Sequence, residues 1–316
     1  MRIVTRPDFD GIVCAVLLHK AEDIDIDILW VEPNEIQKGQ VEICKNDIMA
    51  NLPYSSDCGM WFDHHISNKP KKEFAGAFAI APSAAGVIFK YYKSKNKLDD
   101  TYDELVLNTD IIDAADLNID QVRHPENYPY ILLSMTIQNH EYKDIDYWNK
   151  LIDLLMEKNI DQVIADPEVK KRCHKVILEN TAFEKHLLTH TKIINKISIT
   201  DFRSLDTIPE GNRFLTYSLF PETIASIKLR FDEPEHKNVQ ISIGHNIFQK
   251  ACNVNIGNLL ARYGGGGHAG AGGCTLNAKT ADKALENIFE SMFQNNLHGA
   301  DPIDKLTTQD ELKKEI

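Results

Sequence analysis

Four short stretches in the N-terminal half carry carboxylate, amide or imidazole side chains that suit metal binding. They read "TRPDFDG" (5–11), "MANLPY" (49–54), "MWFDHHIS" (60–67) and "NTDIIDAADL" (108–117). Their candidate ligands are Asp8, Asp10, Asn51, Asp63, His64, Asp113 and Asp116. Carboxylates crowded in a dry cleft raise one another's pKa unless a cation neutralises them. Oxygen and imidazole ligands without thiolates suit Mn²⁺ or Mg²⁺ better than a structural zinc ion. Together, the four stretches therefore predict a divalent-metal site.

Taken singly, each stretch also has an ordinary structural explanation. An Asp just before a helix is commonly a cap, and a His-His pair commonly lies at the surface or in a hydrogen-bonded core. Asp110, Asp113 and Asp116 are spaced by three, so on a helix they would share a side, which could simply face solvent. A metal site is favoured because the stretches are expected together, at one edge of the same sheet.

That sheet is predicted from the alternation of short apolar runs with helical patterns in the N-terminal part of the chain. We expect strands at 2–5, 26–32, 47–52 and 58–63, and a helix at 10–22. In open parallel sheets, ligands bind at the carboxyl ends of the strands. Three of the four stretches include the end of such a strand and the loop after it, so the sheet would bring them together.

A change of pattern divides the rest of the chain. Helical spacing gives way to strand-like segments at 197–202, 214–220, 225–231 and 239–244, with helices expected at 255–264 and 282–293. The predicted class is α/β, with a doubly wound, mainly parallel N-terminal sheet, a helical connector and a smaller mixed α/β domain. The expected parts are a metal-binding catalytic domain (1–125), a connector packing on it (126–196), a substrate-binding domain (197–296) and a polar tail (297–316).

The stretch "GGGGHAGAGG" (264–273) is a second candidate site. Glycine lets the backbone approach a ligand closely and present N–H groups to phosphate or carboxylate oxygens. A glycine run can also be a flexible linker. This run, however, lies between a helical pattern and the apolar "CTLN", and it contains His268. We therefore interpret it as an ordered anion-binding loop.

Composition narrows the choice of partners. The formal net charge is −12, whereas proteins that grip long nucleic acids without sequence preference need a basic surface. A small or short phosphorylated substrate is favoured. No apolar run approaches the ~18 residues of a membrane span, and the six cysteines form no C-x-x-C pair, so we expect a cytoplasmic protein without a membrane partner. Apolar helical patterns at 128–139 and 147–156 fit either a homodimer face or core packing.

These motifs, in this order, resemble the DHH phosphoesterase superfamily, in the branch with a DHH-associated C-terminal domain. The resemblance rests on "TRPDFDG", "IMANLPY", "DHH" and the glycine stretch, and it covers 1–120 and 200–295. It implies a hydrolase of phosphoester or phosphoanhydride bonds that uses Mn²⁺ or Mg²⁺. Members of the superfamily include nano-RNases, phosphatases of 3'-phosphoadenosine 5'-phosphate (pAp), RecJ-type exonucleases and proteins labelled exopolyphosphatases.

The resemblance also implies a role for each motif residue. Those that look like metal ligands are Asp8, Asp10, His64 and either Asp113 or Asp116. Asp63 would orient these ligands or help to bind the metal. His65 would contact the scissile phosphate. Those that look like a cradle for the terminal phosphate or ribose of the substrate are Gly265, Gly266, Gly267, His268 and Gly272. Arg262, one turn earlier, is either a further phosphate contact or a surface side chain.

Two residues depart from the family pattern. Arg6 stands where related enzymes often have a His, and Asn51 stands where an Asp normally bridges two metal ions. Arginine is permanently cationic, does not ligate metals and pairs well with phosphate oxygens. We therefore expect Arg6 to replace part of the charge of the first metal, which leaves one ion rather than two, with Asn51 near it.

The sequence thus predicts a metal-dependent phosphoesterase that cleaves terminal bonds of short oligonucleotides, pAp-like nucleotides or polyphosphate. His65, Arg6 and Asp63 are the expected catalytic residues. The alternative is a regulatory protein that binds a nucleotide or oligonucleotide without cleaving it, because Arg6 and Asn51 alter the metal-binding motifs.

Overall fold

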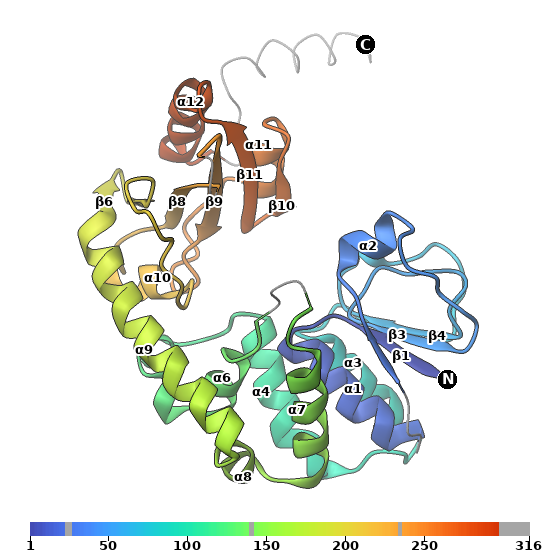
Figure 1. Cartoon of the computed structure of the whole chain (residues 1–316). Helices are drawn as coiled ribbons and strands as arrows, with labels where there is room; N and C mark the ends of the chain where they lie inside the picture. The colour runs from blue at the N-terminus through green and yellow to red at the C-terminus, as the bar shows by residue number, and fades with distance from the viewer. Residues whose placement is uncertain (23–26, 139–141, 233–235, 297–316) are drawn as a thin grey trace, which may run out of the picture. The chain divides into compact units, whose positions relative to one another are not determined.

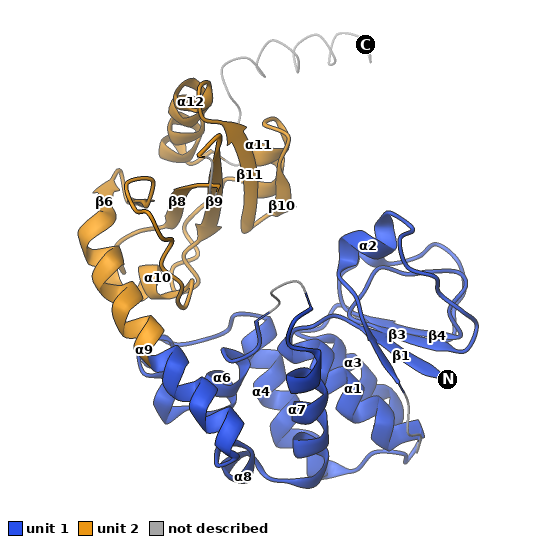
Figure 2. Ribbon diagram, viewed as in Figure 1, with its two compact units in different colours: residues 1–177 blue, residues 178–316 orange. Residues whose placement is uncertain are grey.

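The computed structural model describes residues 1–22, 27–138, 142–232 and 236–296. The chain divides into two compact units, Met1–Ile177 and Leu178–Ile316, and the division falls inside one long helix (Figure 2). Each unit has its own sheet and its own hydrophobic core. The expected polar tail at 297–316 lies outside the described residues, and the expected boundaries at 125 and 196 stay predictions.

The first unit is built on a five-stranded parallel sheet (Figure 1). Its spatial order is β2 (Ile28–Trp30), β1 (Arg2–Thr5), β3 (Asp47–Ala50), β4 (Met60–Asp63) and β5 (Gly76–Phe78). Every neighbouring pair is parallel. The four expected strands are therefore present, and β5 is an additional short edge strand.

The two faces of this sheet are covered differently. Helices cover one face and share its main core, and α1 packs against the other three: α1 (Phe9–Glu22), α3 (Ala84–Lys93), α4 (Asp103–Asp113) and α7 (Ile145–Glu157). The other face buries Val4, Met49 and Trp61 under loops and the short helix α2 (Pro33–Gln37). The predicted α/β class with a parallel N-terminal sheet is confirmed.

The remaining helices of this region follow α4 along the chain. They are α5 (Ile119–Arg123), α6 (Pro129–Ser134), α8 (Ile160–Ile164) and α9 (Pro167–His190), the last of which enters the second unit. Among the described helices, none combines the length and the apolar character needed to cross a membrane.

The second unit contains a six-stranded mixed sheet. Its order is β10 (Gly266–His268), β11 (Ala271–Asn277), β9 (Asn238–His245), β8 (Ala225–Phe231), β7 (Ile197–Asp201) and β6 (Thr191–Ile194). Only the β7–β8 pair is parallel among these described strands. Helices α11 (Ile256–Ala261) and α12 (Ala281–Gln294) contribute to its apolar core. This is the smaller mixed domain that was predicted.

Local structure differs from expectation at two places in the second unit. The expected strand at 214–220 is instead the helix α10 (Leu215–Leu219), because Asn212 accepts hydrogen bonds from the N–H groups of Phe214 and Leu215 and starts a helical turn. The helical pattern expected to run to 196 stops at His190. Asn195 and Lys196, with φ of 48° and 63°, form a two-residue hairpin turn that makes 191–194 a strand.

Candidate metal centre

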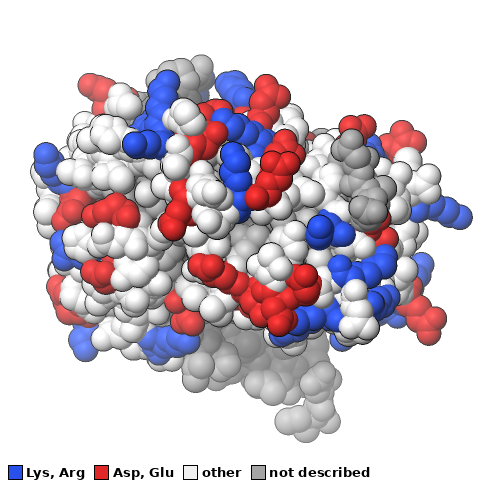
Figure 3. All heavy atoms as spheres, turned by 90° about the horizontal axis from the view of Figure 1, so that it is seen from below, with Lys and Arg blue, Asp and Glu red and all other residues white. Residues whose placement is uncertain are grey.

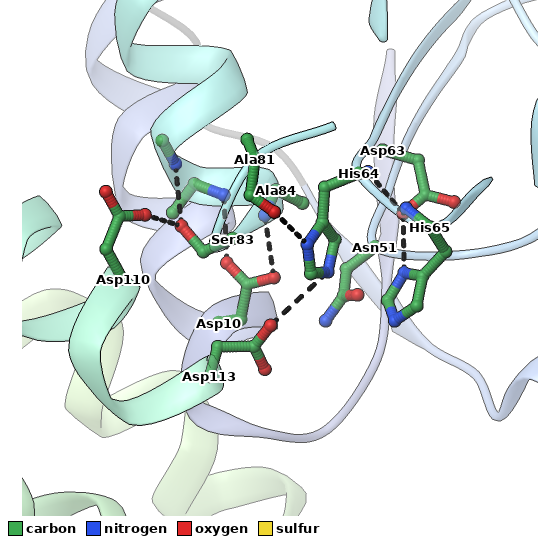
Figure 4. A network of polar contacts seen from close by, with 12 residues as sticks. Asp10, Asn51, Asp63, His64, His65, Ala81, Ser83, Ala84, Asp110 and Asp113 are labelled. Carbon is green, nitrogen blue, oxygen red and sulfur yellow. Dashed lines mark hydrogen bonds and ion pairs between the residues drawn. The ribbon is translucent and has the colours of Figure 1, made fainter. Parts of the chain in front are cut away.

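Several of the candidate ligands lie at the carboxyl edge of the first sheet, where its strand order reverses. Asp8 and Asp10 follow β1, Asn51 follows β3, and His64 follows β4. In a sheet of this order, the crevice between the first and third strands is the usual ligand site. Topology therefore brings side chains from distant parts of the sequence to one place, as Figure 4 shows.

Asp10 is buried in the first turn of α1, with 2% of its surface exposed. Its carboxylate oxygens accept hydrogen bonds from the N–H groups of Ala84 (3.0 Å) and Ala85 (2.8 Å), in the first turn of α3. Burial and the nearby charge of Asp8 raise the pKa of Asp10 to about 7. A bound cation would favour the ionised form of this carboxylate, so Asp10 is suited to ligate one.

His64 is oriented through Nδ1, which lies 2.9 Å from the carbonyl oxygen of Ala81. A carbonyl can only accept a hydrogen bond, so Nδ1 carries the proton and Nε2 of the neutral ring presents a lone pair. Burial lowers the pKa of His64, which favours the neutral ring. Nε2 lies 3.3 Å from Oδ2 of Asp113 but has no hydrogen-bond partner among the described residues. A lone pair facing a carboxylate needs a cation, and a carbonyl-oriented imidazole is typical of metal ligands.

Asp113, rather than Asp116, belongs to this group. Ligand atoms of Asp10, His64 and Asp113 all lie within 4.8 Å of one another. Asp116 joins no such group in the described part of the chain, because α4 ends at Asp113 and the backbone turns at Ala115, where φ is 52°. The expectation that the three acidic residues of this stretch share one side of a helix is therefore wrong for Asp116.

The site fits a hard divalent cation. Its donors are two carboxylates and a neutral imidazole nitrogen, without thiolates. Asn51 adds an amide whose Nδ2 donates to Oδ1 of Asp8 (3.1 Å), while its Oδ1 is buried without a hydrogen-bond partner in the described ranges. Buried acceptors without partners are costly. A cation bound by Nε2 of His64 would give that ring nitrogen a partner.

Asp63 is fully buried and uses both carboxylate oxygens within its own turn. Oδ1 accepts hydrogen bonds from Nδ1 of His65 and from the N–H of His64, both at 2.8 Å, and Oδ2 accepts from Asn68 at 2.7 Å. The hydrogen bond to Asp63 raises the pKa of His65. Donor atoms of Asp63, His64 and His65 also lie within 4.8 Å of one another, but these contacts fit an orienting role for Asp63 better than direct ligation.

Arg6 lies beside two carboxylates. Its Nε is 3.4 Å from Oδ2 of Asp8 and 3.4 Å from Oε2 of Glu32. Asp8 therefore contacts a guanidinium and the amide of Asn51, and it is outside the group of Asp10, His64 and Asp113. Sequence reasoning missed Glu32. Its position as the last residue of "IDILWVE", directly after an expected strand at the same sheet edge, is the signal that could have found it.

The glycine stretch, in the second unit, forms the β10–β11 hairpin. A Cβ on Gly265, Gly267 or Gly272 would lie 2.3–2.4 Å from a backbone oxygen, so close packing requires these glycines. A Cβ on Gly266 would meet nothing within 4 Å, and His268 is exposed. Arg262 is the exposed C-cap of α11. The phosphate-cradle role of this stretch stays a prediction.

Comparison with known proteins places the structure beside solved phosphodiesterase and exonuclease structures. No protein-family model matches the sequence, and no curated protein matches it significantly. The structure is similar to that of PggH, a pGpG-specific phosphodiesterase from Vibrio cholerae, with a TM-score of 0.81 and 32% identity over 93% of this chain and 99% of that one. RecJ from Thermus thermophilus, in complex with Mn²⁺, matches with a TM-score of 0.52 and 13% identity over 90% of this chain and 50% of RecJ. The second likeness shows the fold alone.

Proposed function

The chain belongs to the DHH phosphoesterase superfamily, and from this we propose that it is a metal-dependent phosphodiesterase that hydrolyses short phosphorylated substrates. A linear dinucleotide such as pGpG is the best candidate. The substrate of PggH supports this choice, since the two chains share 32% identity over nearly their whole lengths. Short oligonucleotides, pAp-like nucleotides and polyphosphate are the other substrates that the sequence allows.

The observation that carries the proposal is the group of Asp10, His64 and Asp113. Their donor atoms lie within 4.8 Å of one another, and Nε2 of His64 has no hydrogen-bond partner in the described part of the chain. These residues would hold Mn²⁺ or Mg²⁺. A divalent cation there would supply Lewis acidity and lower the pKa of water, as it does in other metal-dependent hydrolases.

Neighbouring residues would orient the substrate and balance its charge. Asp63 holds the His65 ring through Nδ1 (Figure 4), and an imidazolium at this position would donate to a phosphate oxygen of the substrate. Arg6 is 41% exposed and would offer its remaining N–H groups to the same phosphate. Preorganised donors of this kind stabilise charge that develops on phosphate oxygens in a site with little water.

Surface charge supports a short substrate over a long nucleic acid. The net charge is −12. On the face drawn in Figure 3, basic side chains are interspersed with acidic ones, and the described residues form no continuous basic track across it. Long polyanions are gripped mainly by such tracks.

A substrate screen tests the proposal. Purified protein with Mn²⁺ or Mg²⁺ is incubated with pGpG, other dinucleotides, longer oligonucleotides, pAp and polyphosphate, and mononucleotide or phosphate release is measured. We expect metal-dependent cleavage of dinucleotides, abolished by EDTA. Tight binding of a dinucleotide without cleavage under every metal condition would instead establish the regulatory alternative.

A further inference from the structure

The sheet of the second unit has one apolar face and one polar face. Ala225, Ile227 and Leu229 of β8 are buried in the core with α11 and α12. Side chains alternate along a strand, so Lys228 and Arg230 project from the opposite face. The face of the sheet that lacks α11 and α12 therefore carries cations.

Strand register places Lys228 in one row with the glycine hairpin. Gly266 pairs with Gly273, Gly273 pairs with Ser242, and Ser242 pairs with Lys228. Directly paired residues project from the same face of a sheet, so this row lies on the polar face. With three strand spacings of ~4.8 Å, the row spans ~14 Å. The surface along this row is shallow, because the two residues between Gly266 and Lys228 are Gly273 and Ser242, which have small side chains.

Lys228 is partly buried among like charges. Burial and the positive charges of Arg230 and Arg213 lower the pKa of Lys228. Nε of Arg230 donates to Oε1 of Gln240 at 2.9 Å. Within the described ranges, none of these three cations forms an ion pair with a carboxylate. In a chain of net charge −12, this is a site where an anion would relieve repulsion.

We propose that Lys228, together with Arg230, binds a phosphate group of a ligand that extends along the glycine row to Gly266. Guanidinium and ammonium groups are the usual protein donors to phosphate, and a charged donor strengthens the hydrogen bond. The choice of ligand rests on the proposed function: a linear dinucleotide would place its terminal phosphate at Lys228. An effector distinct from the substrate could bind at the same place if it carries a phosphate group, and the test below distinguishes the two.

The test is equilibrium binding by the full-length protein in EDTA at low salt, which removes metal-dependent binding and hydrolysis. The probes are pyrophosphate and the matched pair pGpG and GpG, which differ by one terminal phosphate. The variant is Lys228→Gln. Its control is Lys283→Gln, an exposed lysine on α12, the helix that packs on the apolar face. Circular dichroism confirms the fold, and Arg230→Gln is a second variant.

We expect Lys228→Gln to weaken pyrophosphate binding about tenfold, since a hydrogen bond to a charged group contributes on that scale, while Lys283→Gln binds like the wild type. A dinucleotide ligand also requires that the wild type prefer pGpG to GpG and that Lys228→Gln lose this preference. If Lys228→Gln binds pyrophosphate more weakly but still prefers pGpG to GpG as the wild type does, the site belongs to a separate phosphate-bearing effector. Equal pyrophosphate affinities of Lys228→Gln, Arg230→Gln and Lys283→Gln overturn the proposal. Dinucleotide hydrolysis is measured in a separate assay with metal, so failure of the proposed function can be distinguished from failure of this binding site.

Discussion

Nδ1 of His64 lies 2.9 Å from the carbonyl oxygen of Ala81, and this contact decides which ring nitrogen faces Asp10 and Asp113. A neutral imidazole has one donor and one acceptor nitrogen. Because Ala81 takes the donor, the acceptor points at two carboxylates, an arrangement that is unfavourable until a cation joins them. Ala81, in the loop after β5, thus orients the ring of His64, the residue that follows β4, for metal binding.

Replacing His64 with Ala is expected to abolish hydrolysis and to weaken Mn²⁺ binding more than about 100-fold, because loss of an outer hydrogen-bond partner alone costs about 10- to 100-fold. The melting temperature of the metal-free protein should fall modestly, because the substitution removes the hydrogen bond from Nδ1 to the carbonyl oxygen of Ala81, and circular dichroism confirms that the variant is folded. Titration calorimetry with Mn²⁺ measures the affinity. His174→Ala, at an exposed position on α9, is the control. Retained turnover in His64→Ala would show that the ligand assignment is wrong.

The pair Asp113→Asn and Asp116→Asn tests which residue of the acidic stretch is the ligand. Only Asp113 has a donor atom grouped with those of Asp10 and His64. We expect Asp113→Asn to reduce Mn²⁺ affinity and activity by an order of magnitude or more, while Asp116→Asn keeps both. Calorimetry and dinucleotide hydrolysis give the two readouts. Equal losses in the two variants would contradict the assignment to Asp113.

Asp10 makes the stability of the metal-free protein depend on pH. Its pKa is raised from 3.8 to about 7 by burial and by Asp8, so between these values the folded state holds a proton that the unfolded chain has released. The free energy of unfolding therefore falls as pH rises through this window, by at most about 1.4 kcal/mol per pH unit. Urea unfolding in EDTA at several pH values measures the slope. Asp10→Asn should flatten it, and an identical slope in that variant would refute the assignment.

The framework of the site was predictable because short-range signals determine it. Apolar runs at 2–5, 47–52 and 58–63 predict the parallel strands, and parallel strands end at one edge, so convergence of Asp10 and His64 followed from pattern alone. The choice of Asp113 over Asp116 was not predictable. It depends on where α4 ends and on the turn at Ala115, and helix ends are uncertain by one or two residues even in structures.

Long-range contacts account for most of what the sequence did not reveal. Glu32 reaches Arg6 only because β2 lies beside β1. The strand at 191–194 exists because a tight turn at Asn195 and Lys196 pairs it with β7, although its residues continue a helical pattern. The row from Gly266 to Lys228 depends on the register of four strands, which spacing along the chain does not contain.

Arg6 and Asn51 should limit the protein to one Mn²⁺ ion per chain. The Arg6 guanidinium lies 3.4 Å from Asp8, where its charge would oppose a second cation, and Asn51 offers a neutral amide in place of a carboxylate. Metal analysis after dialysis should give one equivalent for the wild type. The double variant Arg6→His/Asn51→Asp restores the family pattern and should bind a second. Two equivalents in the wild type would rule out this role for Arg6.

Two glycines of the hairpin should separate packing from ligand binding. A Cβ on Gly272 would lie 2.4 Å from the carbonyl oxygen of Gly266, whereas a Cβ on Gly266 would meet nothing within 4 Å. Gly272→Ala is therefore expected to lower the free energy of unfolding by about 1–3 kcal/mol, as overpacking does. Gly266→Ala should keep wild-type stability but raise KM for a dinucleotide, because its methyl group would occupy the floor of the proposed binding row. Urea unfolding and initial-rate kinetics measure the two effects. If Gly266→Ala leaves KM unchanged while remaining folded, the ligand does not cross that strand.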